Sequence, residues 1–377
     1  MKRSLLVVFF ILILSHTAFA LEYTGNLSLS LSEEYNDNVF LESSDTVDDF
    51  ITHISPGIGL SLRSQTSQFR LRYTPTFSFY SINNDLNETA HQFTTNGNFA
   101  FSEKASSELT YTFIKSSEIR DFIDITDIGP ITRRLERRFH IFNTNFTYRL
   151  AQRIDYTLGI AYSDLDYAEP DQSEVKTYSG YMSLNYRLGE HLSFSARGNF
   201  VKYDYRPDSD ATMQEYTGGL TYRFNPRCSL SITGGPIITK IEDTGETNSD
   251  FGGGIVLTRT DERGNTTLAV RQTVIAGVES GEPLRSREAV LTITRELTPK
   301  WNISLSAYYK EYETVQTDTT DTDSVGLNGS ITYRLSPWAN LVLNYSFIDY
   351  EDNIVGTESY QNNIVSLRID LNYAKRL

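Results

Sequence analysis

The chain has 377 residues, of which 34 are basic and 48 acidic, for a net charge of −14 at pH 7. This acidity excludes the basic surface that nucleic-acid binding needs, and the single cysteine, Cys228, excludes an internal disulfide. Aromatic residues make up 12% of the chain although only 39% of it is hydrophobic. The mean hydropathy is −0.36.

Residues 1–20 have the features of a secretory signal peptide. A basic start precedes an apolar run at 5–14, and Ala18 and Ala20 fit a cleavage site between small residues. The apolar run is too short to cross a bilayer as a helix. We therefore expect one mature domain over residues 21–377, and loss of the two basic residues in the signal leaves a net charge of −16.

Beyond the signal, apolar and polar residues alternate in one segment after another. Alternation with period two predicts strands that have one apolar and one polar face. Eighteen such segments can be placed, at 24–36, 51–63, 68–80, 89–102, 107–117, 135–150, 154–168, 174–188, 191–205, 213–224, 228–242, 249–260, 265–279, 285–296, 300–313, 323–335, 338–350 and 361–374.

The connections between these segments alternate in length. Those after even-numbered segments are short and polar, such as 65–67 and 151–153, whereas those after odd-numbered segments are longer, such as 37–50. Outer-membrane barrels have this asymmetry, and their aromatic girdles and polar lumen explain the composition. The sequence predicts an all-β, antiparallel up-and-down transmembrane barrel of about 18 strands, with 16 as the alternative count and both termini in the periplasm. A large soluble β-solenoid or sandwich is the alternative fold.

Such a barrel places the protein in the outer membrane of a Gram-negative bacterium, in contact with lipid and lipopolysaccharide. The alternation also assigns faces to its strands. Arg70 and Arg72 share the polar face of 68–80, as Arg368 and Asp370 do in 361–374. Arginine on the lipid face at mid-membrane costs about 2–4 kcal/mol, so we expect these charged side chains to line the pore.

Four segments end on the same aromatic-Arg-apolar triplet, and segment 51–63 ends in a similar way. The inward positions of these endings predict a partial ring of arginines at the periplasmic mouth, formed by Arg63, Arg149, Arg187, Arg223 and Arg334. Guanidinium groups bind carboxylates and phosphates in a bidentate manner, so the ring suits an anionic substrate. The alternative is that these arginines pair with neighbouring acids and brace the wall.

No catalytic motif is found. The four histidines after the signal, His53, His91, His140 and His191, lie far apart, and neither HExxH nor GxSxG occurs. The segment nearest to a calcium loop, Asp321–Gly326, has Val325 at a ligand position, which favours solvated loop charge. We therefore predict no enzyme, cofactor or metal site.

The segment SEEYNDNVFLESSD at 32–45 resembles the start of bacterial outer-membrane barrels of the β-barrel porin 2 family. It is also similar to barrels associated with exopolysaccharide export. The resemblance implies a barrel of 16 to 18 strands. It further implies a polysaccharide substrate in some members, which work beside a periplasmic polysaccharide export protein.

Two main functions remain open. The first is passage of a secreted exopolysaccharide from periplasm to cell surface, and the alternative is a general diffusion porin for small solutes. A porin needs a loop folded inward, for which only 118–134 has suitable apolar residues, namely Ile119, Phe122, Ile123, Ile125 and Ile128. A structural or adhesive barrel without transport, or an enzyme, is a weaker reading.

Overall fold

The computed structural model describes residues 22–118, 129, 134–168, 174–207, 210–315, 321–352 and 359–376. The predicted signal peptide, 1–20, lies outside the described residues. No helix in the described part of the chain is long and apolar enough to cross a membrane.

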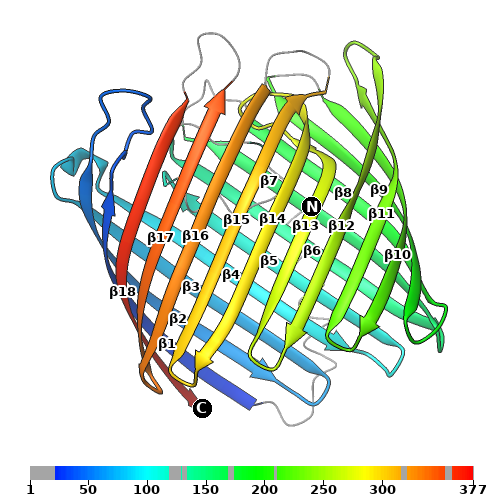
Figure 1. Ribbon diagram of the computed structural model, residues 1–377, viewed down its shortest axis with the longest axis horizontal. Helices are drawn as coiled ribbons and strands as arrows, with labels where there is room; N and C mark the ends of the chain where they lie inside the picture. Colours follow the sequence, from blue (N-terminus) through cyan, green and yellow to red (C-terminus); the bar gives the residue numbers. More distant parts are fainter. Residues whose placement is uncertain are drawn as a thin grey trace, which may run out of the picture.

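The described residues form a closed antiparallel barrel (Figure 1). Each strand pairs with its neighbours in sequence, and β1 also pairs with β18, which closes the sheet. The eighteen strands are β1 (Glu22–Asn36), β2 (Asp49–Arg63), β3 (Ser67–Tyr80), β4 (Glu88–Ala100), β5 (Ala105–Ser116), β6 (Arg137–Ala151), β7 (Ile154–Tyr167), β8 (Glu174–Arg187), β9 (Leu192–Arg206), β10 (Ala211–Asn225), β11 (Cys228–Ile241), β12 (Thr247–Asp261), β13 (Gly264–Ala276), β14 (Pro283–Thr298), β15 (Trp301–Thr314), β16 (Asp321–Ser336), β17 (Ala339–Asp352) and β18 (Tyr360–Arg376). The predicted fold and the count of 18 are confirmed, and the soluble alternatives are excluded.

Connection lengths alternate as predicted. The connections after even strands run from two residues, as at 152–153, to four, as at 101–104, and form one end of the barrel. The first residue of β1, Glu22, and the last residue of β18, Arg376, both lie on this side of the barrel. Short turns mark the periplasmic side of outer-membrane barrels, so the opposite end, with the longer connections, is the external one.

The outer surface is an apolar belt. On β17 the outward Leu343 and Tyr345 are 45% and 39% exposed, and Leu343 pairs with Leu367 of β18, which is 51% exposed. The inward Asn344 pairs with Ser366. An exposed apolar face of this kind is stable only against lipid, because in water it would invite association.

Part of the lumen is filled at its external end. Inward side chains from β5 to β11 pack into a buried apolar cluster, the lumen cluster, in which Leu165 is 0% exposed. Its buried members are Ile114, Phe139, Leu165, Tyr167, Val175, Val201, Tyr203, Tyr205, Ala211, Met213, Ile237, Ile241, Val274, Ala276, Val278 and Val315. Burial of each large apolar side chain contributes about 1.5–3 kcal/mol, so this half of the lumen behaves like the interior of a soluble protein.

The end of the β13–β14 hairpin belongs to this cluster because it turns into the lumen. Pairing between β12 and β13 stops at Gly253 and Gln272, whereas β13 and β14 stay paired up to Ala276 and Pro283. We call residues 277–282, which join β13 and β14, the tip. Its Val278 is 1% exposed. The predicted strand 265–279 is therefore too long at its end, because the chain leaves the wall there.

Candidate channel and its constriction

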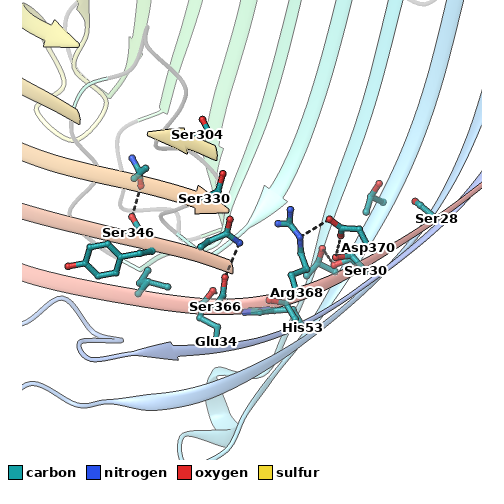
Figure 2. A pocket seen from close by; sticks show the side chains of 18 of the residues that line it. Ser28, Ser30, Glu34, His53, Ser304, Ser330, Ser346, Ser366, Arg368 and Asp370 are labelled. Atoms are coloured by element: carbon teal, nitrogen blue, oxygen red, sulfur yellow. Dashed lines mark hydrogen bonds and ion pairs between the residues drawn. The ribbon is translucent and has the colours of Figure 1, made fainter. Parts of the chain in front are cut away.

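Along the inner faces of β1–β3 and β15–β18, the lumen contains a polar cavity of about 820 Å³ (Figure 2). Most of its lining is hydroxyl and amide, from Ser28, Ser30, Ser32, Ser55, Thr74, Thr76, Ser304, Ser306, Asn328, Ser330, Asn344, Ser346 and Ser366. The side chains bond to one another across strands, as where Ser346 Oγ donates to Asn328 Oδ1 at 2.6 Å. These small polar groups leave the cavity wide and wettable.

Three of the predicted pore-lining residues, Arg72, Arg368 and Asp370, lie in this cavity. Arg72 donates to Ser28 Oγ at 3.2 Å, and Arg368 Nε meets Asp370 Oδ2 at 3.1 Å. Figure 2 shows Ser30 beside the same carboxylate, to which its hydroxyl donates at 2.7 Å. The cavity thus carries both signs of charge. Arg70 shares the β3 face of Arg72, one pleat nearer the periplasmic end.

The five arginines of the predicted ring lie on five strands, each at or near its periplasmic end. Arg149 Nε and the Arg187 Nη2 lie 3.3 and 3.6 Å from the same acid, Asp155. The bracing interpretation therefore describes these two. In the described part of the chain, the other three arginines, Arg63, Arg223 and Arg334, make no ion pair.

A small pocket, which we call the constriction, adjoins the cavity on its external side. It has a volume of about 50 Å³, shares Glu34, Ser346 and Ile364 with the large cavity and is also lined by Glu118 and Arg134. Glu118 and Arg134 flank the 118–134 connection, and their charged groups meet at 2.7 Å.

Tyr80 of β3 holds this pair in place. Its hydroxyl donates to the Glu118 carboxylate, and its ring lies 4.8 Å below the Arg134 guanidinium. Although burial opposes the charge, the Glu118 carboxylate holds the pKa of Arg134 above its usual value. The constriction therefore holds the Arg134 guanidinium, as a cation, against the Glu118 side chain.

The predicted inward loop, 118–134, is described only at its two ends and at Gly129. The Gly129 N–H donates to the carbonyl of Ala276 at 2.8 Å, so this point of the loop reaches the tip of the β13–β14 hairpin. The five apolar residues named for that loop lie outside the described residues.

Sequence reasoning missed the tip. Its letters, GVESGE, hold a single large apolar residue, Val278, which gave no sign of inward packing. A signal was available in its two glycines: Gly277 has no room for a side chain beside Ser280, and Gly281 has a φ of +69°. Both favour a tight reversal over a wall strand.

The described residues include no group of three or more His, Cys, Asp or Glu side chains that could hold a metal ion. The segment nearest to a calcium loop, Asp321–Gly326, lies within β16 and is extended.

Comparison with known proteins gives the same architecture. No family model matches the sequence, and no curated protein matches it either. Among solved structures, the chain is similar to OccAB4 of Acinetobacter baumannii, with 12% identity, a TM-score of 0.50, and coverage of 95% of this chain and 99% of that one. The outer membrane protein OpdK of Pseudomonas aeruginosa is similar at 9% identity and a TM-score of 0.49, with 93% and 99% coverage. OccK2 (OpdF) of the same organism, solved in complex with glucuronate, has 9% identity and a TM-score of 0.49, with 94% and 98% coverage.

At such low identity the likeness to OccAB4 shows the fold alone, and it agrees with the closed barrel described above. The closed barrel and the apolar belt around it are themselves what a chain in the outer membrane of a Gram-negative bacterium needs, and they place this chain there. The expected resemblance is confirmed at the level of a porin-like barrel. The comparisons give no support to the finer resemblance, to the exopolysaccharide-export group.

Proposed function

We propose that this protein is a passive channel for small hydrophilic solutes, the general diffusion porin of the two predicted functions. The observation that carries the proposal is the unequal filling of the lumen. A polar cavity along β1–β3 and β15–β18 leads to a narrow pocket, while the other half of the external end is closed by the lumen cluster and the tip. Small solutes fit this path, whereas a polymer needs a wide and continuous one.

The charged side chains of the path favour solutes that carry polar groups of either sign. Arg72, Arg368 and Asp370 offer ion pairs in the cavity, and Arg134 with Glu118 offers an ion pair in the small pocket next to it. The pore-lining role of the nine predicted residues is part of this proposal. Lipid and lipopolysaccharide around the belt are the partners that this function needs, and a periplasmic export protein is not among them.

Conductance across planar bilayers tests the proposal. The folded protein is expected to give discrete conductance steps, and a variant in which the tip, residues 277–282, is replaced by a two-residue turn is expected to give larger ones. A folded barrel that conducts in neither form contradicts the channel. Measuring the polysaccharide at the cell surface and in the periplasm of a strain without the gene decides between the two predicted functions. Retention of the sugar in the periplasm would support export.

A further inference from the structure

The lipid-facing wall has a groove of about 910 Å³ across β10–β14. One edge of the groove is a row of outward residues that pair directly across seven neighbouring strands. In order from β9 to β15 they are Phe194, Leu220, Ile232, Ile255, Val270, Ala289 and Tyr309. Every member is apolar or aromatic, so this edge continues the lipid-facing belt without a break.

Glycines form the floor of the groove. The next outward row toward the external end begins with Gly218, Gly234 and Gly253, which pair in register on β10, β11 and β12. Three strands in a row therefore lack a side chain at the same level. The ring of Phe251 covers Gly234, since a Cβ there would lie 2.6 Å from it, whereas nothing lies within 4 Å of a Cβ at Gly218, so the floor is open at Gly218. The result is a groove one side chain deep in an outer wall that is otherwise covered by side chains.

The same row turns polar at its other end. It continues through Gln272, Arg287 and Glu311 on β13, β14 and β15. Gln272 Nε2 donates to the Phe251 carbonyl at 2.6 Å, and Arg287 Nε donates to Gln272 Oε1 at 3.2 Å. This second row is thus apolar over β10–β12 and polar over β13–β15.

The two ends lie at different heights in the membrane. Phe194 is the third residue of β9 from its periplasmic end, and Tyr309 is the ninth residue of β15 from its own. The groove therefore runs from a polar end nearer the external surface down to an apolar end nearer the periplasm. An amphiphile in the outer leaflet has this same order of polar and apolar parts.

We propose that the groove is a binding site for one acyl chain of a membrane lipid, which stays seated on Gly218 beside the Phe251 ring, with its polar end toward Gln272 and Arg287. The groove faces the hydrocarbon core of the membrane, so the molecules that can enter it are the acyl chains of lipids. A seated chain also regains the dispersion contacts that an unfilled groove one side chain deep would lose.

Photolabelling tests the site. The protein is reconstituted in vesicles of phosphatidylethanolamine and phosphatidylglycerol that contain a small fraction of phosphatidylethanolamine with a diazirine in its acyl chain. After irradiation and digestion, adducts are expected to concentrate on peptides that contain Leu220, Ile232 and Ile255. Even labelling over the whole belt, including Leu343 and Leu367, would overturn the proposal.

A matched pair of variants separates seating from general contact with lipid. Gly218→Leu fills the floor without a clash, because nothing lies within 4 Å of a Cβ there. Filling the floor removes the dispersion contacts that hold the chain there, so groove labelling is expected to fall to the level of the rest of the belt. Gly329→Leu is the control: Gly329 also has no atom within 4 Å of a Cβ and pairs with the outward Leu305 and Tyr345, away from the groove.

Labelling that Gly218→Leu leaves unchanged in a folded barrel would overturn the proposal, as would an equal loss in Gly329→Leu. Folding is read from the heat-dependent mobility of the barrel in gels. If Gly218→Leu does not fold, the wild-type labelling map decides alone, together with native mass spectrometry, which is expected to find one retained lipid.

Discussion

Arg285 on β14 donates from Nε to the Asp250 carboxylate on β12 at 2.9 Å, although β13 lies between these two strands in the barrel. The contact forms because β13 turns into the lumen beyond Gln272 and leaves its neighbours to meet. Asn248 of β12 bonds likewise to the carbonyl of Val315, just after β15, at 3.3 Å. Side chains therefore close the external part of this wall, where a backbone ladder would normally do so.

Asp250→Asn is expected to loosen that closure. A hydrogen bond to a charged group contributes about 1.5–3 kcal/mol, so amide protection over 247–252 should fall by roughly tenfold or more. Hydrogen exchange read by mass spectrometry measures it. Asp261→Asn is the control, because its pair with Arg295 lies where β12 and β13 remain joined by their backbones. Equal loss of protection in both variants would contradict closure of the wall by the Asp250–Arg285 contact.

Arg137→Met is expected to destabilise the barrel by about 3–5 kcal/mol, because it removes one partner of a buried ion pair. The Arg137 side chain is 0% exposed and meets Glu279 of the tip at 3.3 Å. The freed tip should also raise conductance. Arg138→Met should cost only about 0–1 kcal/mol, since its pair with Asp166 is exposed to 46% and 33%. Denaturant unfolding in micelles compares the stability of the two variants. Similar unfolding midpoints would show that the Arg137–Glu279 pair does not hold the tip in place.

Leu165→Ala should leave a void in the lumen cluster and cost about 2–5 kcal/mol. Leu165 is 0% exposed, while Leu158 on the same strand is 44% exposed and faces lipid. Leu158→Ala should therefore cost less, since lipid tails can fill the space it leaves. The same unfolding experiment measures both, and a larger loss at Leu158 would show that the cluster does not support the barrel.

Ile331→Arg should destabilise the barrel by about 2–4 kcal/mol, whereas Ser330→Arg should not. Ile331 is 42% exposed on the lipid side, and Ser330 lines the polar cavity. Unfolding from vesicles gives the energies. If both arginines were tolerated alike, the face assignment of β16 would be wrong.

Asp370→Asn should shift ion selectivity toward anions, because it removes the acid that lies 3.1 Å from Arg368 and leaves that cation unbalanced in the cavity. The reversal potential in a KCl gradient measures the shift. Asp349→Asn serves as the control, since Asp349 lies on the outward face of β17 beside Gln361, 3.2 Å away. A shift of the same size in the control would place the effect outside the pore.

The strands, their faces and the alternation of short and long connections could all be predicted from the sequence. Each rests on a period-two pattern that a barrel wall imposes on nearly every residue, as Leu343 and Asn344 illustrate. The face of Arg72 followed in the same way, because lipid excludes a guanidinium.

The tip could not be predicted by that reasoning. Val274, Ala276 and Val278 continue the alternation of β13, and the pattern states only that the two faces differ. In a wall strand these residues would meet lipid, whereas in the turned hairpin they meet the lumen cluster. Both surroundings are apolar, so the sequence pattern is the same. Asp155, which joins Arg149 and Arg187, was missed for a related reason, because pairing depends on register.

The two halves of the lumen obey different rules of substitution. Inward positions at the external ends of β5 to β11 are fixed in volume by neighbours such as Phe139 and Ile237, so they change only in concert. Inward positions of β15 to β18, such as Ser304 and Ser346, border open space and can each be exchanged alone. New permeability can therefore be designed at the inward positions of β15 to β18, one residue at a time. The packed cluster on the other side of the lumen keeps the barrel in shape during such changes.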